Sequence, residues 1–166
     1  ASYSAPTATS FVNAPFAGLD FAGTTASFTS RNGGTSFVLG SVASTGTGST
    51  VNGGTNASST TTTTFVVGSA NKDTLFAGGF TQSSPGIAAL TKVGNGTLTL
   101  TGINNYTGAS NWNGGVLKLD YTTNPTGILA TTTAQNFGGG TLSLLGKSSG
   151  TTTQTLGAVT VNSGGG

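Results

Sequence analysis

The chain has 166 residues, which suits a single domain spanning 1–166, and only 5% of them are charged, against about 25% in ordinary soluble domains. Five basic and three acidic residues give a net charge of +2, too thin a basic surface to neutralise a run of phosphates, so we exclude nucleic acid as a partner. No apolar stretch approaches the roughly 18 residues that a membrane helix needs, so we expect no membrane span.

Strand signals dominate the chain. Helix signals are nearly absent because Thr, Gly and Ser interrupt every window long enough for a helix. Several segments are rich in β-branched, leucine or aromatic residues and are bounded by Gly or Asn, as strands commonly are. In chain order the predicted strands are 35–39, 64–67, 97–101, 116–119, 141–145 and 158–161. The sequence therefore predicts an all-β fold.

Two all-β architectures share these features. Asn-Gly steps between strands are typical of hairpins, which would give an antiparallel sandwich or meander. One strand type that returns after a glycine turn also suits a parallel solenoid. The strand beginning at Gly96 returns at Gly115 and at Gly140, steps of 19 and 25 residues. Hairpin strands return about every 8 to 12 residues, so the spacing favours the solenoid.

Stacking the three copies gives a leucine core. Alternate side chains of a strand point to opposite faces, so one face carries only leucines and the other carries Thr, Val, Lys and Ser. The predicted stacking core is Leu98, Leu100, Leu117, Leu119, Leu142 and Leu144. Each leucine buried between coils contributes on the order of 1.5–3 kcal/mol, which a single coil cannot obtain alone. With about 22 residues per coil, we expect a parallel solenoid of roughly seven coils.

Residues 75–119 resemble the autotransporter-associated β-strand repeat, most specifically in LTKVGNGTLTLTG at 90–102 and NYTG at 105–108. The resemblance implies a right-handed parallel β-helix outside a bacterial cell, of the kind found in autotransporter passengers and very long secreted proteins. Trp112 stands where that repeat usually has a small or β-branched residue. Residues 1–64 match the pattern only loosely and are expected to form the N-terminal coils.

Catalytic motifs are incomplete. Residues 146–150 fit G-x-S-x-G and residues 69–72 fit S-x-x-K, but the chain has no His to act as a base and lacks the companion motifs. Asp20, Asp73 and Asp120 are far apart in sequence, which disfavours a carboxylate pair. Without Cys or His ligands, and with Gly-Gly pairs better suited to corners of positive φ, we expect no metal and no cofactor. We therefore expect no enzyme.

Binding functions remain as alternatives. Tyr106, Trp112 and Tyr121 lie close together in sequence, and either pack at coil corners, which we favour, or contact glycans at the surface. The second interpretation makes the chain an adhesin-type passenger module that binds glycans or host surfaces. Outward threonines also suggest ice binding, although Lys118 interrupts the column and Thr is a common strand residue in any case.

A structural function is our first hypothesis. The last strand and the glycine turn after it carry no charge and no Pro, so the sheet edge there is unguarded. Either the chain is a piece of a longer solenoid, or the coil continues onto another copy. With little charge on each coil to repel a neighbour, copies would stack head to tail, and a contact that does not close gives a filament. We expect an extracellular or cell-surface bacterial protein that assembles end to end with copies of itself.

Overall fold

The computed structural model describes residues 17–23, 25–31, 33–54, 61–123 and 126–163, together with the backbone of residues 2–4. The described residues are all-β, without a helix. The strands are β1 (Ser2–Ser4), β2 (Gly18–Asp20), β3 (Ser27–Thr29), β4 (Ser36–Leu39), β5 (Ser41–Ala43), β6 (Thr50–Gly53), β7 (Thr62–Val67), β8 (Thr74–Phe76), β9 (Gly79–Gln82), β10 (Ile87–Lys92), β11 (Thr97–Leu100), β12 (Ser110–Trp112), β13 (Val116–Asp120), β14 (Gln135–Phe137), β15 (Thr141–Leu145) and β16 (Val159–Val161). All six strands predicted from the sequence are present.

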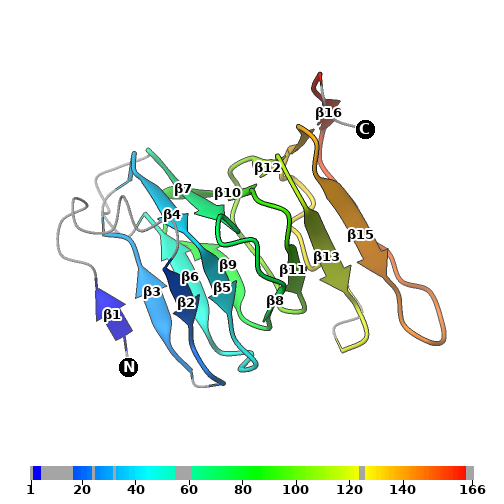
Figure 1. Cartoon of the computed structure of the whole chain (residues 1–166), viewed down its shortest axis with the longest axis horizontal. Coiled ribbons are helices and arrows are strands. Elements are labelled where there is room, and N and C mark those ends of the chain that lie inside the picture. Colours follow the sequence, from blue (N-terminus) through cyan, green and yellow to red (C-terminus); the bar gives the residue numbers. More distant parts are fainter. Residues whose placement is uncertain are drawn as a thin grey trace.

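The strands form a right-handed parallel β-helix. Face 1 contains β1-β3-β6-β9 and face 2 contains β4-β7-β10-β12-β14-β16, in order along the solenoid. Face 3 contains β2-β5 and β8-β11-β13-β15, which meet at a parallel bridge between Ser44 and Phe76. Every strand pair recorded among the described residues is parallel, so the antiparallel alternative is wrong. Figure 1 shows the strands side by side along the long axis, from β1 near the N-terminus to β15 and β16 at the other end.

The solenoid makes about five turns, fewer than the roughly seven predicted for the whole chain. The turns of the N-terminal half are longer than the predicted 22 residues: Phe37 pairs with Phe65, and Val51 pairs with Phe80. The shortest step, from Leu98 to Leu117, is one of the two steps from which the period was taken. Part of the loosely matching region 1–64, namely residues 1, 5–16, 24, 32 and 55–60, lies outside the described residues.

The leucine columns have the predicted register. Leu98 pairs with Leu117, which pairs with Leu142, and a second column joins Leu100, Leu119 and Leu144 in the same way. The four members in β11 and β13 are buried, whereas Leu142 is only half-buried and Leu144 is 52% exposed. The prediction that Leu144 is buried is therefore wrong, because β13 is its one neighbouring strand among the described residues.

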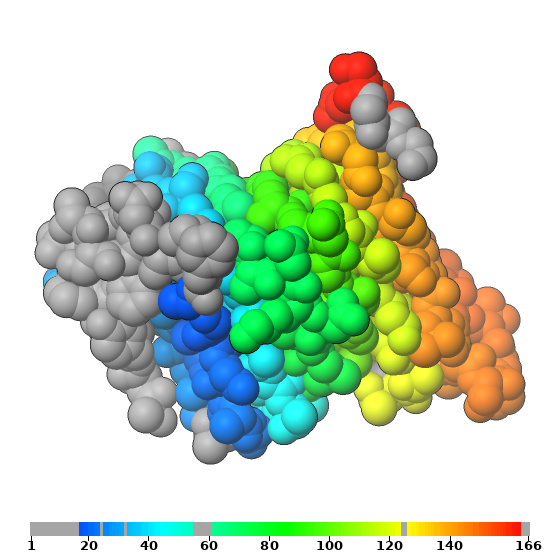
Figure 2. Space-filling view, viewed as in Figure 1, coloured from blue at the N-terminus to red at the C-terminus, as the bar shows by residue number. Residues whose placement is uncertain are grey.

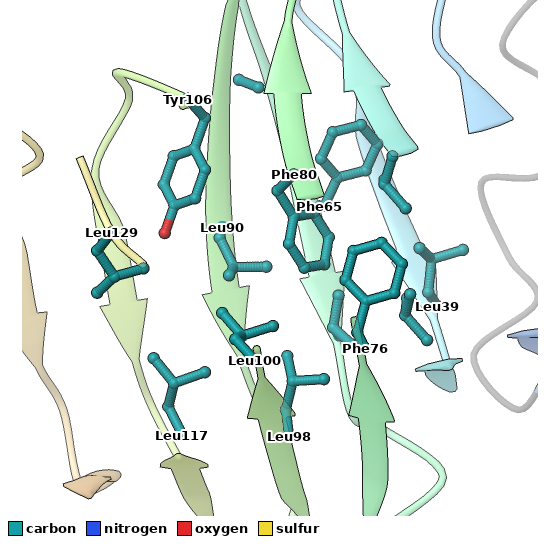
Figure 3. Close-up of a cluster of buried hydrophobic side chains, with 14 of the residues drawn as sticks. Leu39, Phe65, Phe76, Phe80, Leu90, Leu98, Leu100, Tyr106, Leu117 and Leu129 are labelled. Carbon is teal, nitrogen blue, oxygen red and sulfur yellow. The ribbon is translucent and has the colours of Figure 1, made fainter. Parts of the chain in front are cut away.

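Aromatic rings take the place of leucine in the N-terminal half of the core. Phe65 lies between Phe37 and Leu90 in the same column on face 2. The rings of Phe76 and Phe80 meet edge to face, with centroids 5.2 Å apart, and bring faces 3 and 1 together across the interior. Figure 3 shows Phe65, Phe76 and Phe80 gathered beside the smaller Leu90, Leu98, Leu100 and Leu117. One apolar core thus runs between the three faces.

Face 1 changes its construction after β9. Here the side-chain amide of Asn104 accepts a hydrogen bond from Phe80 N at 2.8 Å and donates one to Ile128 O at 3.0 Å. One layer later, Gln154 accepts from Leu129 N at 3.1 Å and donates to Leu129 O at 3.0 Å. These amides replace backbone partners, so the layers stay connected where regular strand pairing is missing.

Glycines occupy the corners, as predicted. Gly34, Gly54 and Gly139, each from one of the Gly-Gly pairs in the sequence, have φ values of 77°, 72° and 113°. Residues other than glycine rarely adopt positive φ, so glycine at these positions lets the chain turn from one face to the next at little energetic cost.

Candidate functional site

The three aromatic side chains predicted at a glycan surface lie inside the solenoid. Tyr106 is 1% exposed, and Trp112 and Tyr121 are completely buried. None of the three offers a ring face to a sugar, so the predicted glycan contact at these positions is wrong. The alternative prediction of packing was closer, although the rings belong to the hydrophobic core rather than to its edge.

Each of these aromatics has a polar partner in the interior. Tyr106 Oη lies 2.7 Å from Ser110 Oγ, and Trp112 Nε1 donates to Gln135 Oε1 at 3.0 Å. Tyr121 Oη donates to Gln154 Oε1 at 2.5 Å. Burial raises the pKa of the Tyr106 phenol far above its ordinary value, against the effect of the Ser110 hydrogen bond. Burial likewise raises the pKa of Tyr121 to about 12. Both phenols therefore stay neutral and serve the structure.

The three acids lie on or beside face 3, in different layers, and each accepts a hydrogen bond from a nearby backbone amide. Asp20 accepts from Ala22 N at 2.8 Å, and Asp73 accepts from Thr97 N, one layer on, at 2.7 Å. Asp120 accepts from both the amide and the hydroxyl of Thr122. Partial burial acts to raise the pKa of Asp120, but these hydrogen bonds and the Lys118 ammonium 3.9 Å away hold it below its ordinary value. Within the described ranges, no three His, Cys, Asp or Glu side chains gather as metal ligands would.

Lys92 is a buried residue that the sequence reasoning missed. Its side chain points inward at the end of β10, between Val67 and Trp112 in the column. The ammonium donates to the carbonyl oxygens of Val93 at 2.7 Å and of Gly94 and Gly114, both at 3.3 Å. Burial lowers the pKa of Lys92, and the negative charge of Asp73 partly offsets this. The alternation of Ala88, Leu90 and Lys92 could have placed it inside.

A shallow groove of about 480 Å³ lies on the outside of face 3. It is lined by Asp73, Thr74, Leu75, Thr97, Thr99 and Lys118. Asp73 already accepts a hydrogen bond from the backbone amide of Thr97, and the Lys118 ammonium lies 3.9 Å from the Asp120 carboxylate. Both charged side chains of the groove therefore have partners within the protein.

Most of the exposed large apolar side chains of the described residues lie at the C-terminal end. Leu144 is 52% exposed, Val159 is 56% exposed and Val161 is 64% exposed. By register these are core positions: Leu144 continues the column of Leu119, and the two valines continue those of buried Gln135 and half-buried Phe137. Among the described residues, the last members of these interior columns are thus more than half exposed.

The last strands of faces 2 and 3, β16 and β15, each pair with a neighbouring strand on one edge only among the described residues. In the part of the chain that the structure describes, β15 pairs with β13 alone and β16 with β14 alone. Neither strand contains a charged residue or a Pro, the usual protections of a sheet edge. Figure 2 shows the last described residues, in red, standing out from the body. We define the C-terminal edge as β15 and β16 together, and we take it as the candidate site.

Comparisons with protein-family models, with curated proteins and with solved structures returned no match. The resemblance of residues 75–119 to the autotransporter-associated repeat therefore stays a prediction. In the described residues, no helix has the length and hydropathy needed to cross a membrane.

Proposed function

We propose that this chain is a structural protein of the bacterial cell surface or exterior, which stacks head to tail with copies of itself into a filament or layer. The observation that carries the proposal is the C-terminal edge, where Leu144, Val159 and Val161 continue core columns yet are 52–64% exposed. A further layer would bury these side chains, each contributing on the order of 1.5–3 kcal/mol when fully covered.

The outer faces support a passive, durable role. On face 2 the amide of Asn111 donates to Thr91 Oγ1 at 3.2 Å, and Asn136 donates to Asn111 Oδ1 at 2.9 Å. On face 1 Ser27 and Thr50 lie 2.8 Å apart through their hydroxyl oxygens. Layers are therefore joined through side chains as well as through the backbone. On these faces, polar side chains of neighbouring layers thus hold one another.

An extracellular location agrees with two features of the sequence. The chain has no Cys, so its stability does not depend on a redox compartment. The resemblance of 75–119 to the autotransporter-associated repeat implies export. The alternative of adhesion through glycans is weakened, because the proposed contact residues Tyr106, Trp112 and Tyr121 are buried.

Electron microscopy of the purified 166-residue chain tests this function. We expect unbranched filaments whose diffraction has an axial spacing of about 4.8 Å from the stacked layers. A longer repeat of about 25–35 Å should mark each copy, since five to seven such layers make one chain. Particles that stay monomeric at every concentration from micromolar to millimolar would overturn the proposal.

A further inference from the structure

We propose that Asn113 is a site of spontaneous deamidation, at which the chain converts a neutral corner of the solenoid into a charged one without an enzyme. The reaction does not depend on assembly between copies. Three Asn-Gly steps lie within the described residues, at Asn52, Asn95 and Asn113, and the fold places these chemically identical steps in different surroundings.

The reaction at such a step needs only the chain itself and water. The Gly114 nitrogen attacks Cγ of Asn113, a new C–N bond closes a five-membered succinimide ring, and the Cγ–Nδ2 bond breaks. Ammonia leaves with the proton of the Gly114 amide. Water then adds to one of the two ring carbonyls and opens the ring to aspartate or isoaspartate, either of which is ionised at neutral pH. Glycine favours the attack because it has no Cβ to obstruct it.

Asn52 is held against this reaction. It lies in β6, paired with Thr29 of β3 on one side and with Thr81 of β9 on the other. Its Nδ2 donates to Ser83 Oγ at 3.0 Å, and its Oδ1 accepts from Thr81 Oγ1 at 3.0 Å. Both hydrogen bonds must break, and the strand must open, before the Gly53 nitrogen can reach Cγ.

Asn113 has none of these restraints on its side chain. The side chain is exposed at the corner between β12 and β13, and the following Gly114 is half-buried. Among the described residues, no hydrogen bond is recorded for the Asn113 side chain or for the Gly114 amide, although the Asn113 amide donates to Lys92 O at 2.9 Å. The two reacting groups are therefore both unengaged, next to a Gly115 that already has a φ of 60°.

Asn95 is intermediate between the two. Its side chain is also exposed, but Gly96 after it is buried against the preceding layer. A Cβ at Gly96 would lie 2.3 Å from a backbone oxygen of that layer, whereas the nearest atom to a Cβ at Gly114 would be 3.1 Å away. The backbone at Gly96 thus has less room to turn, and the expected order of reaction is Asn113, then Asn95, then Asn52.

The products change the corner in two ways. Either one adds a negative charge to a chain whose net charge is +2. Isoaspartate also carries the main chain through the former side chain and so lengthens it by a methylene group, beside a Gly115 whose added Cβ would lie 2.5 Å from two carbonyl oxygens of the preceding layer. In addition, Gly114 O accepts from the buried Lys92 ammonium at 3.3 Å. We therefore expect the isoaspartate form to be less stable than the aspartate form.

The test follows the full chain during incubation in mildly alkaline buffer. Samples taken over time are digested with trypsin, and fragment-ion sequencing separates Asn95 from Asn113 within the peptide 93–118. We expect conversion at Asn113 to be at least about tenfold faster than at Asn52, with Asn95 between them, because a restrained site reacts only after local opening. Buffer made with heavy-oxygen water should leave labelled oxygen in the product, as opening of a succinimide requires.

The same chain unfolded in concentrated urea is the control, since all three steps are then equally accessible and should convert at similar rates. The variant Asn113→Gln cannot close the five-membered ring, so it should lose the fastest conversion and keep that of Asn95. Conversion at Asn52 or Asn95 as fast as at Asn113 in the folded wild-type chain would overturn the assignment. No conversion at Asn113 when the unfolded chain reacts would overturn it equally.

Discussion

Hydroxyl and amide side chains take the roles in this solenoid that charged residues have in ordinary domains. Buried Ser110 and Gln135 satisfy the polar groups of Tyr106 and Trp112, and Gln154 satisfies that of Tyr121. A buried polar group without a partner costs about 1–3 kcal/mol, so these pairs allow large aromatic rings to enter a narrow interior. Among the described residues, no buried side-chain nitrogen or oxygen lacks a hydrogen-bond partner.

The buried phenol of Tyr106 predicts a loss of stability in alkali. Its folded-state pKa is raised, so its contribution is complete below the unfolded value of about 10 and is lost as pH rises above it. Tyr121 acts in the same direction, with a pKa of about 12. Between pH 10.5 and 12 the free energy of unfolding should fall by up to about 1.4 kcal/mol per pH unit for each phenol.

Tyr106→Phe should therefore show a shallower decline over this range than the wild type, measured by urea unfolding at a series of pH values. At pH 7 the same variant should be less stable by about 1 kcal/mol, because the hydrogen bond to Ser110 is lost. Parallel pH curves for the variant and the wild type would contradict a buried, neutral Tyr106.

At the scale of the strand and its corner, glycine has two separable roles. Gly115 has a φ of 60°, and an added Cβ would lie 2.5 Å from the carbonyl oxygens of both Gly94 and Gly96 in the preceding layer. Gly127 has nearly the same φ, 58°, but a Cβ there would meet nothing within 4 Å. The pair separates backbone strain from close approach between coils.

Gly127→Ala should cost about 1 kcal/mol, the penalty of a left-handed backbone for a residue with a Cβ. Gly115→Ala should cost at least about 2 kcal/mol more, because two layers must also move apart. Urea unfolding followed by circular dichroism would measure both. Equal midpoints for the two variants would show that the corner at Gly115 tolerates a wider layer spacing.

The sequence predicted faces 2 and 3 better than face 1. The six predicted strands became β4, β7, β11, β13, β15 and β16, all on faces 2 and 3. Those strands are rich in leucine, valine or phenylalanine, and in β11 and β16 these residues alternate with threonine, a pattern visible in the sequence itself. Face 1 has strands as short as Ser27–Thr29 and later relies on Asn104 and Gln154, whose partners are one layer away.

The same reason explains the aromatic residues. Trp112 appears exposed among Asn111 and Asn113, and its burial depends on Gln135, 23 residues later. The repeat alone was enough to predict the leucine columns, whereas predicting the burial of the aromatic residues required knowing which side chains lie in the next coil. Side-chain pairs that span layers are therefore the part of this core that spacing cannot reveal.

At the scale of the whole molecule, low charge decides how copies can meet. The C-terminal edge contains no charged residue, and the entire chain has a net charge of +2. Electrostatic repulsion between copies is therefore small, and so is electrostatic steering. Burial of Leu144, Val159 and Val161 should supply the driving force for assembly.

Filament growth should accordingly depend little on ionic strength. Raising NaCl from about 0.05 M to about 0.5 M shortens the range of charge interactions to a few ångströms but leaves apolar burial in place, so the growth rate should change by less than about twofold. Sulfate should speed growth, because it strengthens burial by exclusion from the surface. Light scattering on matched samples gives both rates. A tenfold fall in growth over the NaCl series would instead assign the contact to charged residues such as Lys118 and Asp120, and the apolar edge would no longer account for assembly.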